Sequence, residues 1–137
     1  RNMSYKISQI EGIGEAYARQ LEAVGVNTVE QLLEKCSSKK GRTLLADETG
    51  ISEKLILKWT NHADLFRIKG VAGQFAELLE AAGVDTVKEF RHRVASNLHI
   101  KLVEINDARN ICNRVPSVFE LERMIVQAKE LPPVLTY

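Results

Sequence analysis

The residues with the clearest chemical potential are the glycines of a short turn that occurs twice. Gly12-Ile13-Gly14 stands in the first copy, and Gly70-Val71 stands 58 residues later in the second. Glycine accepts backbone angles that other residues avoid, so these positions suit tight turns. A helix that starts directly after such a turn presents unpaired backbone N–H groups and the positive end of its dipole. The chemistry that this arrangement favours is the binding of an anion such as phosphate.

Patterns typical of catalysis or metal binding are missing from the sequence. His62, His92 and His99 form no ligand pair at helical spacing, and Cys36 and Cys112 stand alone. No Ser/His/Asp order and no phosphate-binding glycine loop of the nucleotide hydrolases is present. We therefore expect no enzyme, no metal, no cofactor and no small-molecule substrate. We expect the two cysteines to be reduced and buried.

The repeated turn belongs to a longer internal repeat. Residues 10–36 match residues 68–94 without a gap, and Ala18, Leu21 and Gly25 each recur at the same spacing. A repeat at a fixed period is strong evidence of architecture. The chain therefore contains two copies of one structural unit.

Apolar residues at helical spacing, capping residues and breakers predict the elements that position the turns. The predicted helices cover residues 15–24, 29–36, 44–46, 52–65, 74–82, 87–94, 96–105 and 117–131. Thr28 and Thr86 begin capping boxes, and Gly25 and Gly83 stand at left-handed helix ends. Residues 37–42 are predicted as a solvated loop. The tail after Leu131-Pro132-Pro133 is predicted as extended, because proline cannot continue a helix.

The sequence around the first turn resembles a known motif. Ile-x-Gly-Ile-Gly followed by an Ala-rich helix resembles the helix-hairpin-helix motif of DNA repair and recombination proteins. The run through Gly50-Ile51-Ser52 resembles the N-terminal helical domain of archaeal and eukaryotic recombinases. The whole chain, with its Leu-Pro-Pro tail, resembles an uncharacterised bacterial family built from two such units. The resemblance implies an all-α fold of two tandem helix-hairpin-helix-like (SAM-like) units, residues 3–67 and 68–137.

The same resemblance implies a way of binding DNA. In helix-hairpin-helix proteins, the backbone amides of the hairpin hold a DNA phosphate without reading the base sequence. Carried over to this chain, the resemblance implicates Gly12, Ile13, Gly14, Gly70 and Val71. Lys69 is a further candidate, because it places a positive charge at the second turn. The second copy departs from the motif, because Ala72 replaces the second glycine.

Two basic clusters are candidates for further phosphate contacts. Lys39, Lys40 and Arg42 form the first cluster, and Arg91 and Arg93 form the second. Lysine and arginine supply most of the nonspecific affinity for DNA. The alternative interpretations are a solvated loop for the first cluster and an exposed helix end, where cations suit the dipole, for the second.

Charge limits the strength of any such binding. The formal net charge is +1 and the pI is about 8.0, whereas a dedicated nucleic-acid binder is usually clearly basic. Glu11 and Glu15 flank the first turn and repel phosphate by Coulomb's law.

The segment 43–59 fits two structural interpretations. Ala46, Gly50 and Ile56 have the spacing of a DNA-reading helix-turn-helix, in which Ser52, Glu53, Lys54 and Leu57 face bases. They fit equally well the second hairpin of a paired helix-hairpin-helix unit, which we favour because leucine reads bases poorly. Trp59 and Phe66 are predicted core residues, with base stacking as the alternative.

The leading hypothesis is a non-catalytic, sequence-independent DNA-binding module. The alternative is a protein-interaction or scaffold domain in which the hairpins only pack helices. The duplicated hairpin favours the first, and the nearly neutral charge favours the second. The longest apolar runs fall well short of the roughly 18 residues that a membrane span requires, so we expect a cytoplasmic protein without membrane partners.

Overall fold

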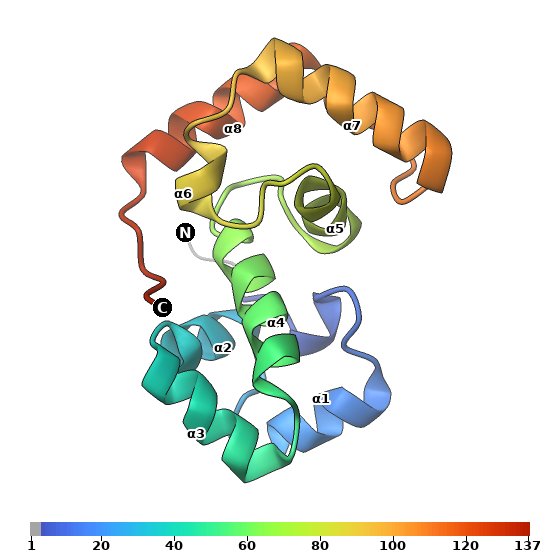
Figure 1. The fold of residues 1–137 in the computed structure, drawn as a ribbon. Coiled ribbons are helices and arrows are strands. Elements are labelled where there is room, and N and C mark those ends of the chain that lie inside the picture. The colour runs from blue at the N-terminus through green and yellow to red at the C-terminus, as the bar shows by residue number, and fades with distance from the viewer. Residues whose placement is uncertain (1–3) are drawn as a thin grey trace. The chain divides into compact units, whose positions relative to one another are not determined.

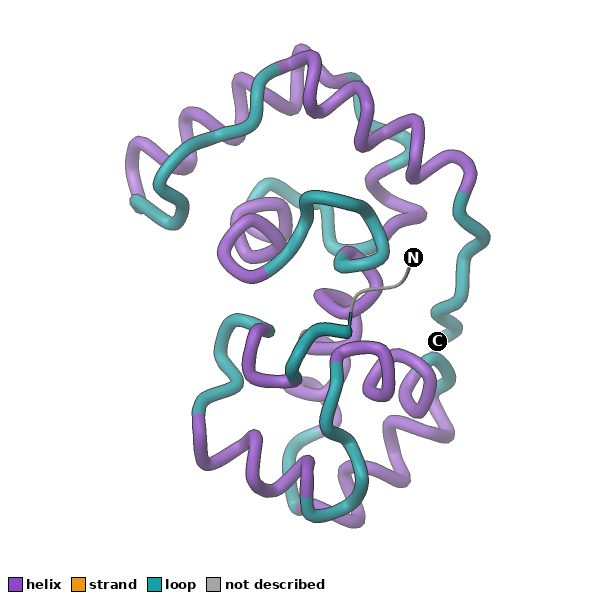
Figure 2. Tube along the Cα trace, turned by 180° about the vertical axis from the view of Figure 1, so that it is seen from behind, coloured by secondary structure: helices purple, strands orange, loops and turns teal. Residues whose placement is uncertain are grey.

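A computed structural model describes residues 4–137, and this part of the chain is all-α (Figure 1). The elements are η1 (Ile7–Gln9), α1 (Glu15–Glu22), α2 (Val29–Cys36), α3 (Lys39–Thr49), α4 (Glu53–Leu65), α5 (Gly73–Ala81), α6 (Val87–Phe90), α7 (Ala95–Arg109) and α8 (Val118–Glu130). Across residues 4–137 the secondary structure is helix or loop, apart from one isolated bridge between Lys6 and Thr28 (Figure 2). Within the same residues, none of the helices is long and apolar enough to cross a membrane.

The chain divides into two compact units. Unit 1 runs to Asp64 and also includes the tail Val134–Tyr137, and unit 2 is Leu65–Pro133. In unit 1, α2 packs on α3, and η1 contacts α1 and α2. In unit 2, α8 packs on α6 and α7, and α7 also contacts α5.

Corresponding positions of the repeat have corresponding local geometry. The Ile13 N–H donates to the Ile10 carbonyl at 3.1 Å, and the Val71 N–H donates to the Ile68 carbonyl at 3.0 Å. Gly25 and Gly83 end their helices at φ values of 89° and 91°. These backbone angles favour glycine, as the sequence predicted.

Helix starts follow the predicted capping residues in most places. Thr28 with Gln31 and Ser117 with Glu120 form complete capping boxes, and the Thr86 side chain accepts from the Glu89 N–H. Each such cap satisfies a backbone donor that the helix itself leaves free.

Three predicted elements differ from the structure. Residues 39–42 are the first turn of α3 instead of a solvated loop, because the Ser38 side chain caps that helix by accepting from the Gly41 N–H. The helix predicted over 87–94 ends at Phe90. The helix predicted to begin at Ser96 begins at Ala95, with Val94 as its N-cap.

The predicted core residues are buried. Trp59 is 0% exposed and Phe66 is 6% exposed, which excludes Trp59 as a surface platform for stacking bases in this conformation. Cys36 and Cys112 are buried, as predicted, and neither forms a disulfide within residues 4–137.

Candidate nucleic-acid interface

The first glycine turn (residues 10–14) leads directly into α1. Gly12 has a φ of 96°, and the buried Ile13 uses its N–H within the turn. Gly14 is the N-cap of α1 and gives it no side-chain cap. Within residues 4–137, the backbone N–H groups of Gly14 and Glu15 have no hydrogen-bond acceptor. The start of α1 therefore keeps the free donors and the dipole end that attract anions.

Neither backbone strain nor crowding requires a glycine at position 14. Its φ is −83°, which any residue adopts, and a Cβ at this position meets no atom within 4 Å. The exposed Gly14 therefore leaves the start of α1 uncovered, and the fold itself does not require this. Gly12 differs, because its positive φ is strained for any residue with a side chain.

Acidic side chains surround this uncovered helix start. Glu11 and Glu15 are both exposed, and the Glu15 carboxylate forms an ion pair with Arg19 at 3.1 Å. The ion pair offsets part of the negative charge beside the turn. Glu11 retains its full repulsion toward phosphate.

The only tryptophan of the chain lies behind the first glycine turn. Its Nε1 is 3.6 Å from the position of a Cβ on Gly12, and its ring makes an edge contact with Tyr17 at 5.0 Å. The Trp59 Nε1–H is buried without an acceptor among the described residues. Trp59 is therefore a built-in fluorescence reporter for changes at this turn.

The second glycine turn (residues 68–72) has the same backbone but a different environment. Gly70 has a φ of 91°, and a Cβ there lies 3.2 Å from the Met124 Cε of α8. The Lys69 N–H donates to the Gln127 Oε1 at 3.0 Å, also from α8. Val71 is fully buried, and its N–H is used within the turn. α8 therefore covers Gly70 and binds the Lys69 N–H, whereas the start of α5, like that of α1, has no side-chain cap.

The first basic cluster divides into exposed and buried members. Lys39 and Lys40 are exposed in the first turn of α3, and Lys39 Nζ lies 3.5 Å from the Glu53 carboxylate. Arg42 is only 4% exposed. Two cations near a helix N-terminus oppose the dipole, so Lys39 and Lys40 do not stabilise α3 through it.

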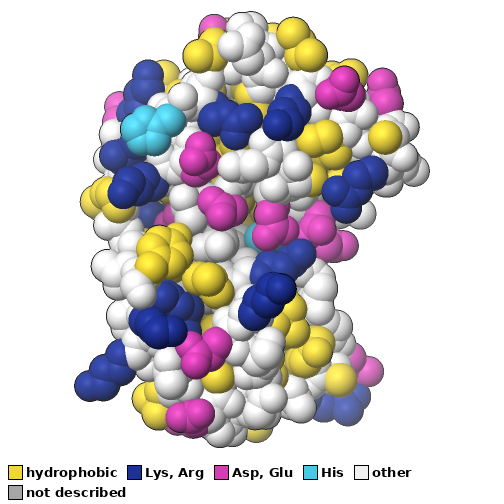
Figure 3. Space-filling model, viewed as in Figure 1, with side chains coloured by type: hydrophobic (Ala, Val, Ile, Leu, Met, Phe, Trp, Pro, Cys, Tyr) yellow, Lys and Arg dark blue, Asp and Glu magenta, His cyan; other side chains and the backbone are white. Residues whose placement is uncertain are grey.

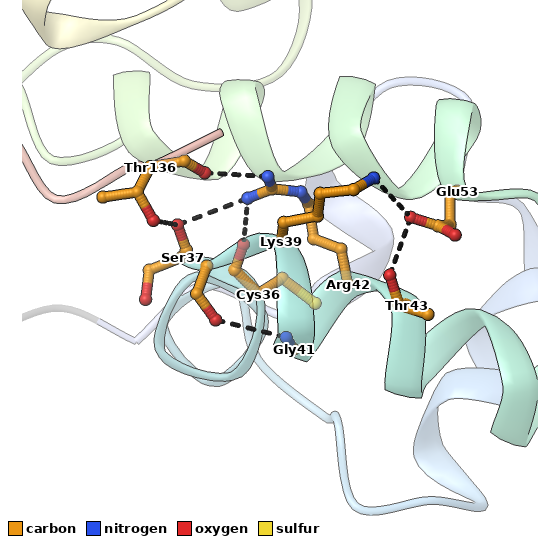
Figure 4. Close-up of polar contacts among 9 residues, drawn as sticks. Cys36, Ser37, Lys39, Gly41, Arg42, Thr43, Glu53 and Thr136 are labelled. Carbon is orange, nitrogen blue, oxygen red and sulfur yellow. Dashed lines mark hydrogen bonds and ion pairs between the residues drawn. The ribbon is translucent and has the colours of Figure 1, made fainter.

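Arg42 ties the C-terminal tail to the end of α2 (Figure 4). Its guanidinium donates to the carbonyls of Cys36 at 3.0 Å, Ser37 at 3.3 Å and Thr136 at 2.7 Å. The Tyr137 ring lies 5.6 Å from the guanidinium carbon, in a cation–π contact. The Thr136 N–H also donates to the Ser37 carbonyl at 2.8 Å. These contacts give Arg42 a structural role, and both of its terminal guanidinium nitrogens already donate to carbonyls.

The second basic cluster is also bonded to the main chain. The Arg91 guanidinium donates to the carbonyls of Ala128 at 3.2 Å and Leu131 at 2.6 Å, at the end of α8. Arg93 donates to the Ala82 carbonyl at 3.2 Å, at the end of α5. The last carbonyls of a helix lack internal partners, and arginine side chains satisfy them here.

Within unit 1, the first basic cluster does not lie at the first glycine turn. The two ribbon views place the start of α1 and the start of α3 on opposite sides of unit 1 (Figures 1 and 2). On the face shown in Figure 3, Lys and Arg side chains are interspersed with Asp and Glu. This arrangement differs from the continuous basic stripe that is typical of strong DNA binders.

The segment predicted as a possible helix-turn-helix contains buried and occupied residues. Gly50 makes the left-handed turn between α3 and α4, and Ile56 is buried. The Glu53 carboxylate accepts from Thr43 at 3.0 Å and contacts Lys39. Leu57 is half-buried. Glu53 is thus partnered and Leu57 is half-buried within unit 1, whereas Ser52 and Lys54 are exposed, so both interpretations of this segment stay predictions.

The buried thiol of Cys36 is chemically quiet. Burial raises its pKa to about 11, and this outweighs the opposing effects of a hydrogen bond with Thr60 and of nearby Lys35 and Arg42. The thiolate is the nucleophilic and metal-binding form of cysteine. Cys36 is therefore a packing residue at neutral pH.

The comparison with protein families places the chain in one of them. The chain belongs to the family described as domain of unknown function DUF4332, whose model matches residues 11–131. This confirms the predicted membership of an uncharacterised family. None of the curated proteins and none of the solved structures matches the chain. The specific resemblance to helix-hairpin-helix proteins stays a prediction.

Sequence reasoning did not identify the residues that distinguish the two turns. Met124 and Gln127 close the second turn from more than fifty residues away. The structural roles of Arg42 and Arg91 likewise depend on contacts with distant carbonyls. The one available signal was the Leu-Pro-Pro segment, which predicted an extended tail but gave no indication of where it docks.

Proposed function

We propose that the protein is a non-catalytic module that binds DNA through backbone phosphates, without sequence preference, at the first glycine turn. The observation that carries this proposal is the uncovered start of α1. Neither backbone strain nor crowding requires a glycine at position 14. Within residues 4–137, the backbone N–H groups of Gly14 and Glu15 have no hydrogen-bond acceptor. A helix start of this kind binds phosphate through several donors and the dipole.

The second glycine turn does not share this role in the proposal. Its amides at Lys69 and Val71 are engaged with Gln127 and Ile68, and Met124 lies against Gly70. Lys69 has an exposed side chain and contributes charge alone. Arg42, Arg91 and Arg93 hold main-chain carbonyls, so Lys39 and Lys40 remain the exposed cations of the two clusters.

The charge of the molecule makes this binding weak and sensitive to salt. With a net charge of +1, few phosphates are neutralised, and nonspecific affinity depends on that number. Glu11 and Glu15 reduce the affinity further. Replacing them by glutamine should therefore tighten binding.

The test is a titration of a short fluorescent DNA duplex at low and moderate salt with wild type and Gly14→Asp. An aspartate suits the N-cap position and stabilises the helix, but its carboxylate takes the free N–H groups and repels phosphate. Binding should weaken about tenfold, the value of a lost charge-assisted hydrogen bond. Ala72→Asp is the matched control, because it changes the same position in the second copy.

Three outcomes would contradict the proposal. The first is no binding at low salt by the folded wild type, and the second is unchanged binding in Gly14→Asp. The third is an equal loss of DNA affinity in Gly14→Asp and Ala72→Asp, because such a loss would result from the added negative charge and not from changing the first turn. Trp59 fluorescence should change on DNA binding in wild type, because the indole adjoins Gly12.

A second candidate function is protein interaction. It is favoured because the guanidinium groups of Arg42, Arg91 and Arg93 donate hydrogen bonds to main-chain carbonyls of the protein itself, and so do not act as dedicated phosphate contacts. In that case the glycine turns serve helix packing alone. Large apolar side chains that are exposed on α7 and α8, among them Ile100, Phe119 and Val126, also favour it.

A further inference from the structure

A hollow in unit 2 lies between the start of α7 and the second half of α8. Its volume is about 440 Å³. Ala95 and Ile125 line it and are each 6% exposed. The hollow is large enough for one or two amino-acid side chains, and it lies at the small end of ligand pockets.

Two valines that line this hollow are unusually exposed. Val94 is 59% exposed and Val126 is 54% exposed. They come from different helices and line the same depression, so a single bound group contacts both. Burying an aliphatic side chain of this size contributes about 1.5–3 kcal/mol when complete. A single exposed valine is ordinary. Two exposed valines that line the same hollow, together with buried aliphatic side chains, form an apolar surface that can contact a partner.

The charges at the hollow are mainly positive. Arg93 and Lys129 line it, and Glu122 is the one acidic residue of its lining. α7 starts here with Val94 as an N-cap that makes no side-chain hydrogen bond, and its first turn contains no acidic residue. The dipole end of α7 adds to the positive potential. An apolar surface with a positive border complements an apolar group that carries negative charge beside it.

We propose that this hollow docks an acidic amphipathic segment of a protein partner. A large apolar side chain of that segment lies between Val94 and Val126, and a neighbouring carboxylate contacts Lys129. The proposal rests on the second function above, to which it gives a location and a partner chemistry. It is independent of phosphate binding at the first glycine turn, which lies in unit 1. The apolar lining and the carboxylate of Glu122 disfavour DNA at this position.

The experiment measures fluorescence anisotropy of two labelled synthetic peptides of equal length, added to the full chain. One peptide carries leucine flanked by glutamates, and the other carries leucine flanked by lysines. The variants are Lys129→Glu and Val126→Ser, both at exposed positions. Lys101→Glu and Ile100→Ser are the matched controls, because these exposed residues lie on α7 outside the lining of the hollow.

The proposal predicts saturable binding of the glutamate peptide and weaker binding of the lysine peptide. Lys129→Glu and Val126→Ser should each weaken the glutamate peptide about fivefold, as expected for one exposed ion pair or one partly buried valine. Lys129→Glu should reverse the preference toward the lysine peptide, which a merely destabilised fold cannot do. The two control variants should bind like wild type.

The proposal is overturned if the glutamate peptide shows no binding up to about 1 mM, the weak end of specific affinity. It is also overturned if both peptides bind equally, or if the controls lose as much affinity as the test variants. Self-association that Val126→Ser abolishes would contradict it as well, because a second copy would then occupy the hollow. Loss of DNA binding in Gly14→Asp bears on the first glycine turn and leaves these outcomes unchanged.

Discussion

The two glycine turns share a backbone and differ in what covers them. Gly12 and Gly70 have φ values of 96° and 91°, and the same hydrogen bond closes each turn. In the second copy, α8 supplies Gln127 and Met124 to the turn. In the first copy, the helix that follows starts at an exposed glycine.

The comparison separates the glycine that the fold needs from the one that it does not. Both copies keep glycine where φ is positive, at Gly12 and Gly70. The second copy has Ala72 where the first has Gly14, and α5 still starts one residue later, at Gly73. Gly14 is therefore free to serve binding.

The largest expected effect tests a close contact between α2 and α3 in unit 1. In Gly41→Ala, the new Cβ falls 1.9 Å from the Lys35 carbonyl oxygen, so α2 and α3 must separate. We expect a loss of about 3 kcal/mol in the free energy of unfolding, because backbone cannot repack around the methyl group. Chemical denaturation followed by circular dichroism measures it. Equal tolerance of Gly41→Ala and Gly14→Ala would refute the contact.

The next effect tests the arginine that holds the C-terminal tail. Arg42→Met should destabilise by about 2 kcal/mol, because it leaves carbonyls of Cys36, Ser37 and Thr136 without a charged donor. Hydrogen exchange at the Thr136 amide should accelerate as the tail loses its tie. Lys40→Met is the control and should leave stability and exchange unchanged. An unaffected Thr136 amide in Arg42→Met would contradict the structural role.

A smaller effect tests the equivalence of the two turns. Gly12→Ala and Gly70→Ala should each cost about 1–2 kcal/mol, because both place a side chain at positive φ. Gly14→Ala should cost less, since its φ is −83° and the space is open. Thermal unfolding midpoints of the three variants provide the ranking. A Gly14→Ala effect equal to that of Gly12→Ala would show that the fold needs both glycines.

The smallest expected effect is a dependence of stability on pH that the capping box of unit 2 has and that of unit 1 lacks. In unit 2, hydrogen bonds from Arg114 and Ser117 lower the pKa of Glu120 to about 2 from an ordinary 4.5. This stabilisation is complete above pH 4.5 and is lost as pH falls toward 2, because the unfolded chain binds the proton first. In unit 1 the same box uses Gln31, which does not titrate. Carboxyl carbon shifts of Glu120 in a pH titration measure the pKa, which should rise in Arg114→Met.

Much of the fold follows from local sequence signals. Thr28, Ser117, Gly25 and Gly83 predicted helix ends correctly, because caps and left-handed glycines act within a few residues. The start of α3 was missed because lysines are unfavourable in a first helical turn, and the Ser38 cap outweighs them. Local signals thus predict helix bounds better than they predict which contacts a charged side chain makes.

The candidate site was only partly predictable. The open turn at Gly14 was expected from the motif, whereas the closure of the second turn depends on Gln127, far along the chain. Arg42, Arg91 and Arg93 were chosen for their charge, and their bonds to carbonyls are tertiary contacts. A sequence gives the charge of an arginine and not the partner that it finds.

The most direct measurement of the central claim is a two-dimensional amide NMR titration of the full chain with a short DNA duplex. The account predicts saturable shifts of the Gly14 and Glu15 amides, with the corresponding Ala72 and Gly73 amides of the second copy unmoved. Trp59, which adjoins the first turn, should shift with them. Shifts at the second copy alone, or no shifts at Gly14 and Glu15 under conditions where the duplex binds, would contradict the claim that the uncovered start of α1 holds the phosphate.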